Sequence, residues 1–212
     1  MMKTLIYKAE NRYLEEAGKV LKEGGIVAFP TDTVYGLGAV YTDERAVRKI
    51  FEAKGRDEGK PLSILVSGPD QVGLLTDEVS EEARILMEKF WPGALTLIFP
   101  KNDTVPDVVA AGGNTVGIRM PADETAVSII RTAGMPLAAP SANTSGKRSA
   151  ACAEEVIEDL DGRIDMVIDG GPCRIGLSST VLDLTGGEIR ILREGTVTRK
   201  MIEEAVGKPV IS

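Results

Sequence analysis

The sequence predicts an α/β domain in which a twisted sheet with antiparallel pairs forms two or three layers with helices. Short apolar runs alternate along the chain with segments whose apolar residues repeat at helical spacing. Near the C-terminus, Thr185-Gly186-Gly187 separates two strand-like segments, which predicts a hairpin. With 212 residues, 43% of them hydrophobic, the chain can bury one substantial core, so we expect a single domain over residues 1–212.

In the first half of the chain, each expected helix has a recognisable boundary. Apolar residues fall on one helical face over 13–21, and Gly24-Gly25 ends that helix. A second helix covers 43–54, and Ser80 is an N-cap for a third that ends at Phe90. The buried or half-buried strands are expected at 4–7, 26–29, 62–66 and 95–99, with a short helix after the Ser67-Gly68-Pro69 turn.

The second half continues the alternation after a loop over 101–114. Trp91, which stands between a helix end and a Pro-Gly pair, is interpreted as a core anchor and not as a base-stacking platform. Helices are expected at 123–133, 153–160 and 198–206, and strands at 116–120, 137–139, 166–169, 181–184 and 188–192, with Arg193 beginning another loop.

Composition excludes several classes of function. The chain contains no histidine, which rules out Ser-His-Asp and Cys-His catalysis and imidazole metal ligation. Its net charge of −7 argues against a generic nucleic-acid coat protein. Cys152 and Cys173 form no Cys-x-x-Cys pair, so neither a disulfide framework nor a zinc site is indicated. Without a signal peptide or an apolar run of membrane length, we expect a cytoplasmic protein.

A polar turn follows the apolar run at 26–29. Pro30 ends the strand, and the hydroxyls of Thr31 and Thr33 flank the carboxylate of Asp32. Polar side chains at the end of a buried strand are typical of a small-molecule site in an α/β fold. An ordinary strand-to-loop turn is the alternative, and these residues alone favour neither interpretation.

Three cations follow one another at the end of the second helix. Lys54 lies in the last helical turn, where complementing the helix dipole would explain it. Arg56 and Lys60 come after Gly55, in a loop where cations could meet an anion. Arg119 lies near the end of the otherwise apolar strand expected at 116–120. Its partner is either a carboxylate of the protein or that of a ligand.

A second strand leads directly into polar residues. Leu137-Ala138-Ala139 runs into the hydroxyl- and amide-rich segment 140–149. Such a segment can be a linker, but linkers rarely start directly from a buried strand, which favours a site here.

Several motifs in this order resemble those of the YrdC-type threonylcarbamoyl-AMP synthases, over roughly residues 12–207. They are Pro-Thr-Asp-Thr-Val-Tyr-Gly-Leu-Gly (30–38), Lys54-x-Arg56, Trp-Pro-Gly-Ala-Leu-Thr (91–96), Val-Gly-Ile-Arg-Met-Pro (116–121), Ala-Pro-Ser-Ala-Asn (139–143), Ser-Ser-Thr (178–180) and Ile-Leu-Arg (191–193).

The resemblance implies a YrdC-like sheet with a concave basic cleft, and an enzyme that makes L-threonylcarbamoyladenylate from L-threonine, bicarbonate and ATP. Magnesium would accompany the ATP. A partner transferase system would then modify the adenosine beside the anticodon of tRNAs, and direct RNA binding is possible. The longer members of the family add a C-terminal domain, which we do not expect in this chain.

The resemblance also implies residue roles. Lys54 and Arg56 would be catalytic. Two departures from the longer members are Leu65, where they have histidine, and Lys60, where they have a nucleotide-contacting asparagine. The ATP-binding set would be Lys54, Arg56, Lys60, Thr115, Ser141, Asn143, Ser149 and Arg193, and the threonine-binding set Thr33, Arg119, Ala139 and Ser179.

The implied reaction suits a chain without histidine, because a carbamate is already a nucleophile and the enzyme need mainly align it and stabilise the leaving pyrophosphate. Three alternatives remain: a double-stranded RNA-binding module without catalysis, the related domain of hydrogenase-maturation proteins, and a non-catalytic binder of threonine or nucleotide.

Overall fold

Side-chain caps begin four of the helices in the computed structural model, which describes residues 3–212. At the start of α2 (Glu44–Lys54), the Asp43 carboxylate accepts the main-chain N–H groups of the first turn at 3.0 and 3.1 Å. Ser80 caps α3 (Glu81–Phe90) as the sequence predicts. The other helices are α1 (Asn11–Lys22), the 3₁₀ helix η1 (Pro69–Leu74), α4 (Asp107–Ala110), α5 (Glu124–Ala133), α6 (Ala153–Leu160) and α7 (Arg199–Val206).

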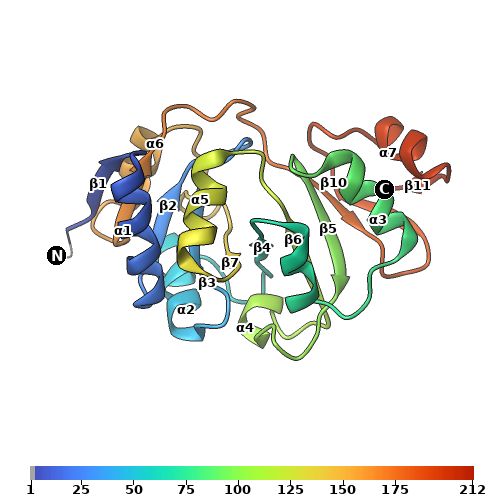
Figure 1. Cartoon of the computed structure of the whole chain (residues 1–212), viewed down its shortest axis with the longest axis horizontal. Coiled ribbons are helices and arrows are strands. Elements are labelled where there is room, and N and C mark those ends of the chain that lie inside the picture. Colours follow the sequence, from blue (N-terminus) through green and yellow to red (C-terminus); the bar gives the residue numbers. More distant parts are fainter. Residues whose placement is uncertain (1–2) are drawn as a thin grey trace.

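Eleven strands form one mixed sheet in the order β1-β8-β2-β3-β7-β4-β6-β5-β9-β10-β11 (Figure 1). Within this sheet, β2 pairs antiparallel with β3, β3 with β7, and β7 with β4. The pairs β4–β6 and β5–β9 are parallel. The mixed sheet with flanking helices confirms the predicted fold class. The strands are β1 (Leu5–Lys8), β2 (Val27–Phe29), β3 (Gly36–Val40), β4 (Ser63–Leu65), β5 (Leu95–Pro100), β6 (Thr115–Arg119), β7 (Leu137–Ala138), β8 (Met166–Asp169), β9 (Thr180–Asp183), β10 (Ile189–Arg193) and β11 (Val210–Ile211).

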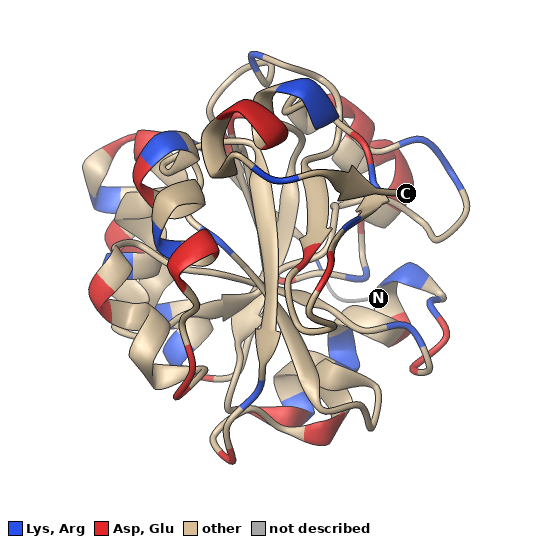
Figure 2. Ribbon diagram, turned by 90° about the vertical axis from the view of Figure 1, so that its right-hand side faces the viewer, with Lys and Arg blue, Asp and Glu red and all other residues tan. Residues whose placement is uncertain are grey.

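Side-chain alternation along β2 divides the core into two clusters. Val27 and Phe29 pack with residues of α1 and α5, which lie side by side in Figure 1. Ile26 and Ala28 point to the other face and join the cluster that contains the apolar residues of α2 and α6. Both faces of the central strands are therefore covered, and the charged residues lie mainly on the surrounding helices and loops (Figure 2). Within residues 3–212, every helix is too short or too polar to span a membrane.

Trp91 is a core residue, as predicted. Its side chain is 9% exposed, and its indole Nε1 donates a hydrogen bond to the Leu95 carbonyl at 2.7 Å. This satisfies the single polar group of a large apolar side chain.

The sequence analysis missed the strands β3 and β11 and the short helix α4. Strand β3 contains Gly36 and Gly38, which read as loop residues. A Cβ at Gly38 would lie 2.7 Å from the Phe29 ring, so this glycine is what allows β3 to pair closely with β2. Arg193 was placed at the start of a loop and is instead the last residue of β10.

Gly195, which follows β10, packs closely against the main chain around Ser179, and its substitution tests this packing. A Cβ on Gly195 would lie 2.7 Å from the main-chain nitrogen of Thr180, and backbone cannot move aside as a flexible side chain can. We expect Gly195→Ala to lower the free energy of unfolding by ~1–3 kcal/mol, measured by urea denaturation. Gly186→Ala is the matched control, because a Cβ there meets nothing within 4 Å. Equal stability of the two variants would contradict the proposed close packing.

Candidate functional site

A cavity of about 310 Å³ opens beside the middle of the sheet, where the turn after β2 faces strands β4, β5, β6 and β9. Three arginines line it, Arg56, Arg119 and Arg193, and no aspartate or glutamate does. This is notable in a chain with a net charge of −7. Hydroxyl groups supply most of the remaining polar lining, from Thr31, Thr33, Tyr35, Ser63, Thr96, Ser141, Ser178 and Ser179.

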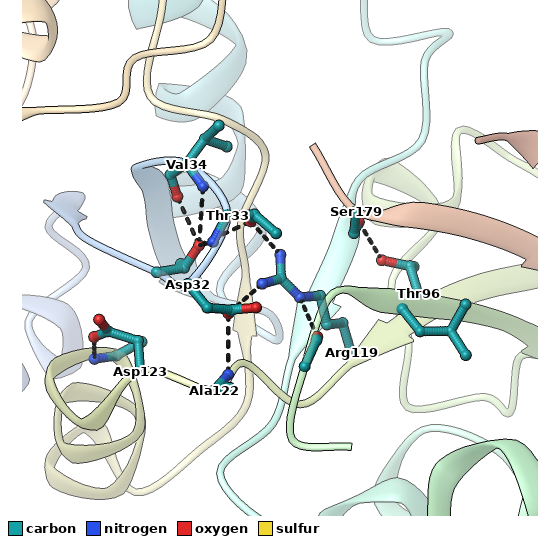
Figure 3. A network of polar contacts seen from close by, with 12 residues as sticks. Asp32, Thr33, Val34, Thr96, Arg119, Ala122, Asp123 and Ser179 are labelled. Atoms are coloured by element: carbon teal, nitrogen blue, oxygen red, sulfur yellow. Dashed lines mark hydrogen bonds and ion pairs between the residues drawn. The ribbon is translucent and has the colours of Figure 1, made fainter. Parts of the chain in front are cut away.

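The Arg119 guanidinium is the most buried of the three and is bonded on three sides (Figure 3). Its Nε donates to the Gly93 carbonyl at 2.9 Å, Nη1 donates to Thr33 Oγ1 at 2.7 Å, and Nη2 forms an ion pair with Asp32 Oδ1. Burial lowers the pKa of Arg119, and the adjacent Asp32 carboxylate opposes this shift. A carboxylate of the protein is therefore one partner of Arg119, and two of its five N–H groups remain for another.

Arg193 reaches the same cavity because of an irregularity in β10. The register between β9 and β10 shifts between Ile191 and Arg193, so that both Leu192 and Arg193 face the cavity. Arg193 Nε donates to the Ser179 carbonyl at 3.0 Å, and the Ser179 hydroxyl shares a hydrogen bond of 2.9 Å with Thr96 Oγ1. Burial lowers the pKa of Arg193.

Lys54 lies beneath the loop that carries Ser141 and does not line the cavity. Its side chain is 1% exposed, and Nζ donates to the carbonyls of Ser141 and Asn143, both at 2.5 Å. The Lys54 carbonyl also accepts the Ser145 N–H at 2.8 Å, so one residue fixes the loop at three points. Burial, and then the nearby Arg56, lower the pKa of Lys54 to about 8, against the attraction of Asp159.

Arg56 enters the cavity because the chain turns sharply before it. Gly55 ends α2 in the left-handed conformation, with φ of 57°. The Arg56 side chain donates from Nη2 to the Pro61 carbonyl at 3.0 Å, and its Nε is buried without a partner. Burial lowers the pKa of Arg56.

The structure brings together seven of the twelve residues predicted for the site: Thr33, Arg56, Arg119, Ala139, Ser141, Ser179 and Arg193 all line the cavity. Their ligand roles stay predictions. Five others do not line it: Lys54 and Asn143 are buried, Lys60 is exposed, and Thr115 and Ser149 are half-buried outside the lining.

Several lining residues were not predicted. Thr96 interrupts an apolar strand, and its position between Leu95 and Leu97 was a signal that could have found it. Ser178 and Tyr35 stand in motifs already singled out. Leu65, one of the two departures from the longer family members, also lines the cavity, so that departure falls within the site.

Comparison with known proteins finds similarity over most of the chain. Residues 19–195 match the model of the Sua5/YciO/YrdC family, described as telomere recombination. The chain is similar to a threonylcarbamoyl-AMP synthase of Pyrococcus abyssi, 49% identical over 192 residues, covering 91% of this chain and 56% of the relative. A threonylcarbamoyl-AMP synthase of Bacillus subtilis is 49% identical over 195 residues, with 92% and 56% covered.

A solved structure is similar over the whole chain. The crystal structure of P. abyssi Sua5 complexed with L-threonine superimposes with a TM-score of 0.94 at 45% identity, covering 100% of this chain and 62% of that one. This chain thus spans less than two thirds of the length of these relatives.

Lys54 and Arg56 lie in different environments, and replacing each of them by methionine tests this difference. Lys54→Met leaves the carbonyls of Ser141 and Asn143 without their donor, so we expect the free energy of unfolding to fall by about 2–4 kcal/mol. Arg56→Met removes only one contact, to Pro61, and should change stability much less. Chemical denaturation of both variants measures this. A Lys54→Met variant as stable as the wild type would show that Nζ does not fix the loop.

The lowered pKa of Lys54 predicts how its contribution to stability depends on pH. The unfolded chain keeps this lysine protonated to about pH 10, whereas the folded protein releases the proton from about pH 8. Between these values the unfolded state binds more protons, so this group makes the free energy of unfolding rise with pH. The difference in unfolding free energy between wild type and Lys54→Met should increase across this window. A constant difference would contradict the assigned pKa.

Proposed function

The chain belongs to the Sua5/YciO/YrdC family, and we propose that it makes L-threonylcarbamoyladenylate from L-threonine, bicarbonate and ATP, with release of pyrophosphate. The observation that carries the proposal is the lining of the cavity, in which three arginines and several hydroxyls converge without an acidic residue. Such a lining suits an anionic ligand with polar groups. The threonine complex of P. abyssi Sua5 supports threonine as the amino acid.

The chemistry requires positioning more than proton transfer. The threonine amine adds to bicarbonate, and loss of water gives a carbamate. A carbamate oxygen then attacks the α-phosphorus of ATP, the bond from that phosphorus to the bridging oxygen breaks, and pyrophosphate leaves. Guanidinium groups aimed at the developing negative charge lower the barrier without changing their own protonation. Arg56 and Arg193 are suited to this role because burial leaves each poorly solvated.

The two ends of the cavity suit different parts of the reactants. Arg119 retains two N–H groups without a protein partner, bonds to the Thr33 hydroxyl and shares the cavity lining with Ser179, a set that fits the carboxylate and hydroxyl of threonine. Ser141 and Arg56 adjoin Lys54 and Asn143, two of the other predicted nucleotide residues, and we assign that end to ATP.

Magnesium would enter the cavity with ATP, as part of that substrate. Within residues 3–212 no group of three or more acidic, cysteine or histidine side chains could hold a metal ion, and the cavity lining contains no carboxylate. These residues do not fit a resident magnesium site, so no step of the reaction is assigned to a metal held by the protein.

We further propose that the product serves tRNA threonylcarbamoyladenosine modification in the cytoplasm, through a transferase system that accepts the threonylcarbamoyl group. The alternative of an RNA-binding module gains no support from the charge distribution on the one side of the molecule that Figure 2 shows. On the side shown in Figure 2, basic and acidic residues are interspersed, whereas counterion release requires a continuous positive face.

Pyrophosphate release tests the proposed function directly. Purified protein incubated with ATP, magnesium, L-threonine and bicarbonate should release pyrophosphate, and omission of either threonine or bicarbonate should abolish it, because the nucleophile contains both. A coupled pyrophosphate assay measures the rate. ATP cleavage that proceeds equally well without threonine, or no cleavage with every component present, would refute the assignment.

A further inference from the structure

Asp32 is a buried acid that the proposed chemistry does not use. It is 3% exposed and lies behind Arg119, outside the cavity lining. Its Oδ1 accepts from Arg119 Nη2 and from the Ala122 N–H, the latter at 3.0 Å (Figure 3). Its Oδ2 is buried without a hydrogen-bond partner.

Stability alone does not explain this arrangement. A buried ion pair repays the desolvation of both charges only when the remaining lone pairs are also satisfied, and an apolar pair of similar volume is often at least as stable. Here one carboxylate oxygen is unsatisfied. Buried polar groups left in this condition are uncommon and need a reason beyond stability.

The contacts of Arg119 supply such a reason. The three groups that hold the guanidinium come from two segments far apart in the sequence: Gly93 after α3, and Asp32 and Thr33 in the turn after β2. Asp32 is the only one of the three that carries a charge. Its ion pair adds a charged contact to the two neutral ones, of which the Thr33 hydroxyl is also shared with Thr31.

We propose that Asp32 is a positioning residue for the amino-acid half of the site: it fixes the orientation of the Arg119 guanidinium and cancels its charge. The proposal rests on the proposed function. Threonine is a zwitterion with no net charge, whereas triphosphate is strongly anionic. A neutralised but oriented guanidinium binds a carboxylate through geometry and does not attract triphosphate to this end of the cavity.

The side chain can be tested without disturbing the main chain around it. The Asp32 carbonyl accepts the Ile175 N–H at 3.0 Å and the Thr33 carbonyl accepts the Gly176 N–H at 2.8 Å, and both bonds survive substitution of the carboxylate. Asp32→Asn keeps an oxygen acceptor for Arg119 and Ala122 but removes the charge. Asp32→Ala removes both.

Calorimetric titration with L-threonine and with ATP, each alone, distinguishes a loss of Arg119 orientation from a general loss of folded structure. We expect Asp32→Ala to weaken threonine binding at least ~10-fold and Asp32→Asn roughly 3- to 10-fold, because loss of a charged partner costs more than its replacement by a neutral acceptor. ATP binding should stay within ~3-fold of wild type or become tighter in both variants, because removing the carboxylate leaves the Arg119 charge uncancelled. If Asp32→Ala does not fold, the same comparison is made between Asp32→Asn and the wild type.

Asp43→Ala is the matched control. Asp43 is also an aspartate whose carboxylate accepts main-chain N–H groups, but it caps α2 away from the cavity. This variant should lose stability while keeping both affinities. Equal weakening of threonine and ATP by the Asp32 variants, or threonine affinity within ~2-fold of wild type, would overturn the proposal and leave Asp32 as a structural ion pair.

Hydrogen exchange of the Arg119 Nε–H, followed by ¹⁵N NMR, gives a readout that needs no substrate. The proton should exchange slowly in the wild type and markedly faster in Asp32→Ala. Unchanged exchange in Asp32→Ala would overturn the orienting role whatever the reaction is. Accelerated exchange in Asp32→Ala, together with a wild type that binds no threonine, would support the orienting role and refute the proposed function instead.

Discussion

The ion pair between Arg119 and Asp32 joins the end of β6 to the turn after β2, across 87 positions of sequence. Neither charge can be buried alone, because an isolated ion in the interior is far costlier than a paired one. Three neutral groups complete the arrangement: the Gly93 carbonyl, the Thr33 hydroxyl and the Ala122 N–H. The segment after α3, the turn after β2 and the start of α5 must therefore all reach their native positions together.

Much of the fold could be predicted because its signals are local. The caps at Asp43 and Ser80 and the left-handed glycine after α2 act within one helical turn, so the sequence contains them directly. Strand β3 could not be found in this way. Its glycines are required by contact with Phe29, which lies on another strand, and glycine in a sequence otherwise indicates a turn. The order of the eleven strands depends on such nonlocal contacts throughout.

The sequence predicts which types of residue form the site better than it predicts where each of them lies. Lys54 and Arg56 are separated by one residue, yet one lies beneath the 141–145 loop and the other in the cavity, because the left-handed Gly55 turns the chain between them. A sequence shows the two cations but not the direction in which each points. Likewise, the sequence left the carboxylate partner of Arg119 open between protein and ligand, and only the fold brings Asp32 to it.

The charges around the cavity are not distributed evenly, and this follows from the pairing of its arginines. Among the ion pairs formed within residues 3–212, Arg119 has a carboxylate partner, whereas Arg56 and Arg193 have none. Burial lowers the pKa of all three, so each gains from an anion that replaces lost solvation. For Arg119 the protein already supplies that anion. The two arginines without a carboxylate partner contribute net positive charge to the cavity lining, whereas the paired arginine contributes an almost neutral set of hydrogen-bond donors. One buried aspartate thus makes the electrostatic contribution of Arg119 to the cavity different from that of Arg56 and Arg193.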